Sequence, residues 1–506
     1  MGFWNSVGNG VRKAIMKLLR INPAPANNII TITEPYSYET NVLRNRLWYR
    51  GDPSELDQFY KQAALDAVGR SRFWAAVPTP KLNIRKIHSG LPAMIVDRLT
   101  DIVISDFDGI ELEKEEQMQL WNEISEDNHF PELLGEAIAE TLVAGDGAFK
   151  ITLDTDVSQF PIIEFYSGER VDYRYIRGRL YEVLFYTDYT HKDKDYRLEE
   201  TYGRGYIRAK LYDSEGKEVP LSTVPDVAEM IPEIIHPNNF IMAVPIKFFK
   251  SPKWQHRGKS IFDSKTDSFD ALDEIISQWI DAIRVGRVQK YIPEDLVPRN
   301  ENTGAPLEPN PFDNQFIKMR SSLREDADDK IITVQPDILY QAYVESYANA
   351  LDMCLQGIIS PATLGIDLKK TDNAEAQREK EKATLYTRGA IIDALNEVIP
   401  RLVDTTLKVY DTMRSRRPGE YQASVVFGEY ASPDFGTVVE TVGKAKTYGI
   451  MSIEQAVQEL YGDTWTEEEK QAEIARLKAE QGYIEADEPQ VGEYDEFSDP
   501  EEDEGE

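Results

Sequence analysis

Cysteine is almost missing from this sequence: among 506 residues there is only Cys354. An intramolecular disulfide is therefore excluded, and a reducing compartment fits this composition. Cys354 falls on the apolar side of a predicted helix, where a free cysteine is typically a core residue.

Long hydrophobic runs are also lacking. No segment approaches the roughly 20 apolar residues that span a bilayer, so we expect no membrane partner. Residues 1–20 form a basic, amphipathic arm, and its Met-Gly start with Ser6 matches a myristoylation pattern. Two interpretations of the arm stay open: a membrane-surface helix, or an arm that docks on this protein or its neighbour. It has no small-residue cleavage site of the signal-peptide kind.

Positive charge is scarce. The chain has 57 Lys and Arg against 89 Asp and Glu, which gives a net charge of −32. General attraction to nucleic acid needs a cationic surface, so this balance argues against a protein that grips nucleic acid in that way. It does not exclude a protein that lets nucleic acid pass. With 41% hydrophobic residues, most of the chain should fold.

Patterns for catalysis or metal binding do not emerge. The five histidines have no metal spacing, and none lies near Cys354. "RGKSIF" (257–262) ends like a phosphate-binding loop, but Lys253 stands where the first glycine should be. We interpret Gly258 as freeing the backbone and Ser260 as capping the next helix. We therefore expect no enzymatic activity, no cofactor and no metal.

The first half of the chain has an α+β pattern. Residues 23–50 have the composition of a connector. Apolar periodicity predicts helices at about 54–67, 89–105, 113–126 and 131–144. From 147 to 213 the sequence is rich in β-branched and aromatic residues, with Gly or polar turns at short spacing, which predicts an antiparallel meander.

A long helix is predicted at 260–286, roughly 40 Å in length. Its apolar positions are spaced three and four apart, as in a coiled-coil seam: Phe269, Leu272, Ile276, Trp279 and Ile283. Acidic positions follow the same rhythm on a different face: Asp263, Asp267, Asp270, Glu274 and Asp281. This acidic row is either a metal array or, more commonly, a solvated face.

Two further long helices follow an insert. Residues 286–335 predict three strands separated by a Pro- and Asn-rich loop. A second helix follows Pro336 and ends at Ser360-Pro361, and a third runs over 373–414 from an Asp372 cap. Pro400 lies inside the third helix and predicts a kink near 396–400.

The last part of the chain has clear signals for the ends of its helices. Residues 421–430 predict a strand that joins the early sheet. Three capped helices follow, two of them with capping boxes formed by Ser452 with Gln455 and by Thr466 with Glu469. Residues 484–506 hold 12 acids among 23 residues and no Lys or Arg, a composition typical of a disordered acidic tail.

Three stretches carry a resemblance to a known family: "GKSIFDSKTDSFDALDEIISQW", "ISPATLGIDLKKTDNAEAQREKEK" and "GIMSIEQAVQELYGDTWTEEEKQAEIARLKAE". Over roughly 40 to 480, the order of parts resembles the portal proteins of tailed double-stranded DNA bacteriophages of the siphophage type. No single motif is as specific as a metal cluster. The order of parts and the amino-acid sequence of the second stretch carry the resemblance.

The resemblance implies an α+β portal fold with an antiparallel-sheet wing, long stem helices, a small β-containing clip, a kinked long helix and a helical crown. The implied parts are an N-terminal arm and connector (1–50), wing (51–257), stem helix 1 (258–287), clip (288–335), stem helix 2 (336–360), tunnel loop (361–372), kinked helix with return wing strand (373–432), crown (433–482) and acidic tail (483–506).

The family also implies a role and partners. The chain would form a homo-dodecameric ring at one capsid vertex of the virion, assembled in the host cytoplasm. Double-stranded DNA would be packaged through the ring by the terminase motor and ejected through it. The implied partners are the terminase large subunit, the major capsid protein, the scaffold protein and a head-tail adaptor at the clip.

The tunnel loop is the part that the resemblance places closest to DNA. Leu364 and Ile366 would be packing or gating residues, and Gly365 would free the turn. Asp367 would also face the channel, and Lys369 and Lys370 are candidates for transient phosphate contact. The alternative is that these lysines pair with carboxylates of the next subunit.

Three other classes of protein stay open: a different phage structural or scaffold protein, a membrane adaptor that uses the arm, and a nucleotide-dependent enzyme.

The lysine pair offers a test of the DNA-contact interpretation. Changing Lys369 and Lys370 to Ala should leave assembled rings intact, because no apolar contact is removed, but should alter DNA retention or packaging. Normal packaging by such rings would contradict it.

Overall fold

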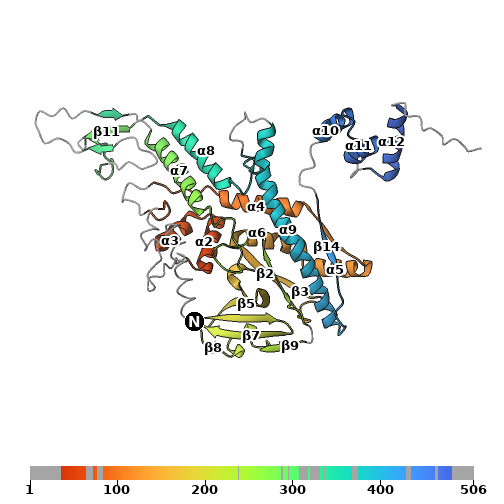
Figure 1. The fold of residues 1–506 in the computed structure, drawn as a ribbon. Helices are drawn as coiled ribbons and strands as arrows, with labels where there is room; N and C mark the ends of the chain where they lie inside the picture. The colour runs from red at the N-terminus through yellow and green to blue at the C-terminus, as the bar shows by residue number, and fades with distance from the viewer. Residues whose placement is uncertain are drawn as a thin grey trace, which may run out of the picture. The chain divides into compact units, whose positions relative to one another are not determined.

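The computed structural model describes residues 36–63, 72–76, 84–236, 239–286, 289–293, 296–306, 317–319, 331–334, 337–366, 374–428, 435–461 and 465–480. Two compact units divide the chain, residues 1–428 and 429–506. Helices and mainly antiparallel sheets alternate in the first unit, and the described elements of the second are helical, so the predicted α+β class is confirmed (Figure 1).

Five helices form the first part of unit 1: α2 (Tyr38–Arg50), α3 (Pro53–Ala63), α4 (Leu91–Ser105), α5 (Glu115–Asp127) and α6 (Phe130–Ala144). The last four match the predicted helices closely. Helix α2 is a correction, because its composition predicts a connector over 23–50. Ser37 starts α2 by accepting a hydrogen bond from the Thr40 amide at 3.2 Å, and Gly51 ends it with φ of 70°.

The strands after α6 build two antiparallel sheets. The larger runs β4 (Val171–Ile176), β5 (Arg179–His191), β6 (Lys194–Gly203), β7 (Tyr206–Asp213) and β8 (Glu218–Val219), with β9 (Glu233–Ile235) paired to β7. The smaller has the order β10-β2-β3, with β2 at Asp146–Thr152, β3 at Ile162–Ser167 and β10 at Ala243–Lys247. Short 3₁₀ turns lie at Gly168–Arg170, Leu221–Thr223 and Pro225–Val227. The predicted meander is confirmed.

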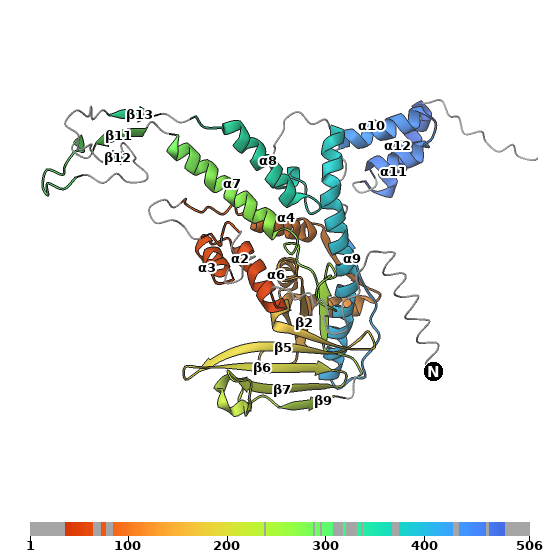
Figure 2. The ribbon, with the colours of Figure 1, turned by 60° about the vertical axis from the view of Figure 1, so that its left-hand side comes forward.

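A helix pair with a small sheet at its end follows. Helix α7 (Thr266–Val285) and helix α8 (Tyr340–Leu355) lie side by side and lead to β11 (Gln289–Pro293), β12 (Ile317–Met319) and β13 (Ile332–Val334) (Figure 2). Strand β11 is central, parallel to β12 and antiparallel to β13. The three predicted strands are confirmed, whereas α7 begins six residues later than predicted.

The third long helix, α9 (Ala374–Met413), returns along the first unit and is followed by β14 (Ala423–Phe427). Strand β14 is antiparallel to β1 (Phe107–Leu112), with Val425 opposite Ile110. The late strand was predicted, but its partner is β1 in a separate two-stranded sheet. Arg388 of α9 strengthens this closure, donating to Asp106 Oδ2 at 2.7 Å and to the Gly428 carbonyl at 2.7 Å.

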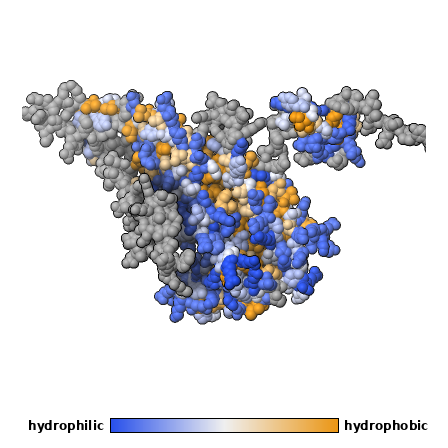
Figure 3. Space-filling view, in the orientation of Figure 1, coloured by the Kyte–Doolittle hydropathy of each residue, from blue (hydrophilic) through white to orange (hydrophobic). Residues whose placement is uncertain are grey.

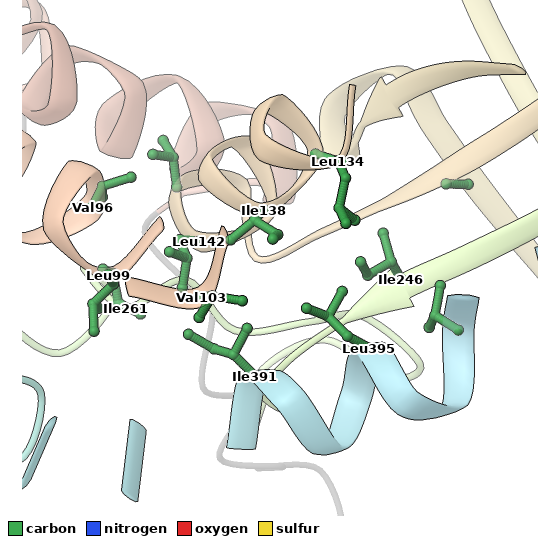
Figure 4. Close-up of a cluster of buried hydrophobic side chains, with 14 of the residues drawn as sticks. Val96, Leu99, Val103, Leu134, Ile138, Leu142, Ile246, Ile261, Ile391 and Leu395 are labelled. Carbon is green, nitrogen blue, oxygen red and sulfur yellow. The ribbon is translucent and has the colours of Figure 1, made fainter. Parts of the chain in front are cut away.

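One hydrophobic core connects these parts. Figure 4 shows Ile391 and Leu395 of α9 pointing toward Val103 of α4, Leu142 of α6 and Ile246 of β10. Ile391 and Leu395 have no exposed surface. Side chains that lie nearly 300 residues apart in sequence therefore fill the same volume, and this packing holds α9 on the body.

Unit 2 is described for α10 (Phe435–Thr447), α11 (Ile453–Tyr461) and α12 (Glu467–Glu480). The Gln455 amide donates to Ser452 Oγ at 3.2 Å, and the Thr466 amide donates to Glu469 Oε2 at 2.9 Å. The Glu469 amide donates in return to Thr466 Oγ1 at 3.4 Å, so this second capping box is complete.

Truncation of a core leucine on α9 tests this packing. We expect Leu395→Ala to lower the free energy of unfolding of unit 1 by about 2–5 kcal/mol, because it leaves a cavity where α9 meets the body. Leu385→Ala, on the same helix but 42% exposed, is the matched control and should cost less than about 1 kcal/mol. Denaturant midpoints read from tryptophan fluorescence give the comparison, and equal shifts for the two variants would contradict it.

Candidate functional site: the paired long helices and the loop after them

The predicted apolar seam of α7 divides into three environments. Phe269 and Leu272 are fully buried in the core of unit 1, where the Phe269 ring lies 5.8 Å from that of Trp48. Ile276 is partly buried. Trp279 stacks on Tyr343 of α8, with ring centroids 6.3 Å apart, and Ile283 is 48% exposed. The seam therefore joins α7 to the body at one end and to α8 further along.

The five carboxylates predicted as one row do not share one surface. Asp263 precedes the helix, where it accepts hydrogen bonds from Asn41 Nδ2 at 2.8 Å and Asn45 Nδ2 at 2.9 Å. Asp270 is buried and accepts from the Phe73 amide at 2.9 Å and the Trp74 amide at 3.2 Å. Burial raises the pKa of Asp270. The expectation of a single solvated face is corrected for these two residues.

The other three carboxylates of the row retain exposed surface. Asp267 is 81% exposed and pairs with Arg72. Glu274 accepts from Gln278 Nε2 at 2.8 Å, and Asp281 lies 3.6 Å from Arg284. Helical spacing placed all five on one side, but residues 72–76 bury Asp270 there and leave Asp267 exposed beside Arg72. Distant chain contacts thus decide which carboxylates meet solvent.

A further carboxylate, Asp273, was missed. It is fully buried and accepts hydrogen bonds from the Trp74 indole Nε1 at 3.2 Å and the Ser89 amide at 2.9 Å, and it lies 2.7 Å from His88 Nδ1. Its position directly after Leu272, inside the apolar stripe, was the available signal. An acid on a core-facing stripe has to find partners there, because an unpaired buried charge is strongly destabilising.

Lys265 is a second missed residue, and it connects the two helices. Its ammonium donates to the carbonyls of Met353 at 2.7 Å and Gln356 at 2.8 Å, at the C-terminal end of α8. A cation there satisfies free carbonyls and interacts favourably with the helix dipole. The residue before α7 therefore caps α8, which fixes the two helices at their shared base.

In the glycine-lysine-serine stretch before α7, the glycine and the serine make contacts that hold this segment on the body. The Gly258 amide donates to Asp146 Oδ2 at 2.6 Å, and a Cβ at Gly258 would lie 2.0 Å from the Gly145 carbonyl oxygen. Ser260 does not cap α7 as predicted. Its hydroxyl donates to the Leu142 carbonyl at 3.1 Å, and Lys265 is the residue at the N-cap position.

The segment between α8 and the predicted tunnel loop bonds to α9, and the loop itself begins beside α9, with Thr363 Oγ1 lying 3.0 Å from Thr384 Oγ1. The Ser360 amide donates to Thr384 Oγ1 at 2.9 Å, and Thr387 Oγ1 donates to the Ile358 carbonyl at 2.6 Å. A 3₁₀ turn (Ala362–Leu364) follows, in which Leu364 is 8% exposed. Gly365 then turns the chain with φ of 71°.

Ile366 contacts the same core as Leu364, so both side chains pack within the chain. Asp367, Lys369, Lys370 and Asp372 lie outside the described residues. Pro400 lies inside α9, and the helix continues on both sides of it. The bend expected at Pro400 stays a prediction.

The described residues form neither a metal site nor a membrane-spanning helix. No group of three or more His, Cys, Asp or Glu in these ranges is placed to hold a metal ion. None of the helices described is both long and apolar enough to span a bilayer.

Comparisons with known proteins add one structural likeness. No family model matches the sequence, and no curated protein matches it. Among solved structures, a chain described as "Neck of native GTA particle computed with C12 symmetry" is 13% identical, over 79% of this chain and 94% of that chain, with a TM-score of 0.35. A likeness at this TM-score does not establish a shared fold.

The buried carboxylate on α7 leads to a stability prediction. Asp273→Ala should cost about 3–5 kcal/mol, because it leaves the Trp74 indole and the Ser89 amide without acceptors. Asp267→Ala removes the same group from an exposed position of the same helix and should cost less than about 1 kcal/mol. Hydrogen exchange measured by mass spectrometry should show residues 84–90 losing protection only in the Asp273 variant. Unchanged protection there would contradict the assigned anchoring role.

Proposed function

We propose that this chain is a portal protein of a tailed bacteriophage, a head-to-tail connector that forms a ring through which double-stranded DNA is packaged and ejected. The support is the succession of α7, a small three-stranded insert, α8, a loop and the long helix α9. This succession matches the stem, clip, tunnel loop and kinked helix that the sequence resemblance implies.

Self-association has physical support on the helix pair. Large apolar side chains stay exposed in its outer half: Ile280, Ile283, Val285, Leu339, Tyr340 and Val344. Figure 3 shows orange, apolar surface over this pair and the small sheet at its end. Apolar residues gathered on one projecting element are typical of an interface. A neighbouring copy's helix pair is the partner that a ring provides.

The charge of the chain fits a conduit. Asp267, Glu274 and Asp281 retain exposed surface along α7, and the whole chain carries −32. If α7 faces the axis of a ring, DNA passes a wall of like charge and does not adhere to it. ATP hydrolysis would belong to the terminase motor, so we propose no catalytic function for this chain.

The proposed partners follow from the same role. The terminase large subunit and then a head-tail adaptor would contact the insert at 288–335, whereas the major capsid and scaffold proteins would surround the ring at its vertex. The second candidate, a different phage structural or scaffold protein, predicts another assembly and is separated by the test below.

Native mass spectrometry of the full chain, with negative-stain microscopy, tests the proposal. We expect closed rings of about twelve subunits and no ATP hydrolysis, because a portal ring closes on itself and leaves ATP chemistry to the motor. Ile283→Asp should shift rings toward monomers by placing a charge in the interface, whereas Ile176→Asp, at an exposed isoleucine of β4, should not. Shells, a monomeric wild type or ATPase activity would each contradict the portal function.

A further inference from the structure

A cavity of about 370 Å³ opens where the base of α7, the end of α8 and helix α9 meet. Its polar lining comes from Lys259, Ser264, Lys265, Gln356 and Thr387. The lining holds two lysines and no Asp or Glu. In a chain with 89 acidic and 57 basic residues, a cavity with cations alone is unexpected. We call it the lysine cavity.

The backbone of Lys259 is held by a hydrogen bond, whereas its ammonium group has no partner among the described residues. Its amide donates to the Phe249 carbonyl at 2.8 Å, which sets the chain direction at the cavity wall. Its ammonium makes no hydrogen bond or ion pair with any residue that the structure describes. The side chain is half-buried, so the charge sits beside the cavity with its three donors unassigned.

Lys265 is held in place on the same wall. Two of its three ammonium hydrogens point to the Met353 and Gln356 carbonyls, which leaves one donor. Burial lowers the pKa of Lys265, and the positive charge of Lys259 lowers it further. An anion between the two ammonium groups would relieve both effects, since it replaces lost hydration and screens like-charge repulsion.

The neighbouring polar groups suit an oxyanion. The hydroxyl of Ser264 and the side-chain carboxamide of Gln356 have no protein partner among the described residues, and both can donate a hydrogen bond. Two ammonium groups with such donors complement an anion that has several acceptor oxygens. Phosphate groups have this chemistry, both as the free ion and as the diester of a nucleic acid backbone.

We propose that the lysine cavity binds a phosphate group, with Lys259 as the principal ligand and Lys265 as a second ligand fixed by its bonds to α8. The site needs one chain only and does not depend on ring assembly. It would neutralise cationic charge at the joint where α8 ends and α7 starts, and would hold α9 to that joint through the wall at Thr387.

Titration of the full chain with sodium phosphate tests the site, followed by ³¹P NMR at constant ionic strength set with sodium chloride. Wild type should bind phosphate saturably. Lys259→Gln should bind at least about tenfold more weakly, because a charge-assisted contact is lost. The variant keeps the backbone bond to Phe249, so folding should be preserved, as circular dichroism will check. Lys217→Gln, an exposed lysine in the turn before β8, is the charge-matched control and should bind like wild type.

A second titration separates the two phosphate sources. Fluorescence anisotropy of a labelled 30-base-pair duplex is measured with the same three proteins at low salt. A loss in Lys259→Gln limited to inorganic phosphate supports a site for the free ion, and a parallel loss of duplex affinity supports backbone phosphate. Absence of saturable binding to both probes, or equal binding by wild type and Lys259→Gln, overturns the proposal.

Discussion

Hydrogen-bonded carboxylates at the base of α7 fix the start of this helix on the body of unit 1. Asp263 ties the segment before the helix to α2, and Asp270 accepts the backbone amides of residues 73 and 74. Asp273 accepts from the Trp74 indole and the Ser89 amide. Each carboxylate is removed from water, so each depends on those donors. The direction of α7, and with it the placement of the insert and α8, follows from these contacts.

Helix α9 closes the same unit from its other side. Ile391 and Leu395 fill the core between α4, α6 and β10, while Thr384 and Thr387 bind the segment that leaves α8. Arg388 joins the end of α4 to the end of β14. The loop after α8 therefore starts from a fixed point, which a loop at a narrow passage would need.

The surface chemistry of the helix pair separates into regions with different uses. Exposed apolar residues gather toward the insert, exposed carboxylates follow α7, and the lysine cavity lies at the base. A portal ring would use the first for assembly and the second to repel DNA. The cavity belongs to neither role, since it is lined by residues of one chain only.

Local sequence patterns alone determined most of the elements. Apolar spacing indicated the seam of α7 and the three strands of the insert, and residue type indicated the caps at Ser452 and Thr466 and the place of Pro400 within α9. It missed α2, because the buried side of that helix includes Asn41, Arg44 and Asn45 and shows no apolar stripe. Only the tertiary structure decided which acids of α7 are buried, that Ser260 bonds to α6, and that Lys265 caps α8. Those outcomes depend on contacts between residues about 90 to 220 positions apart, which local periodicity does not encode.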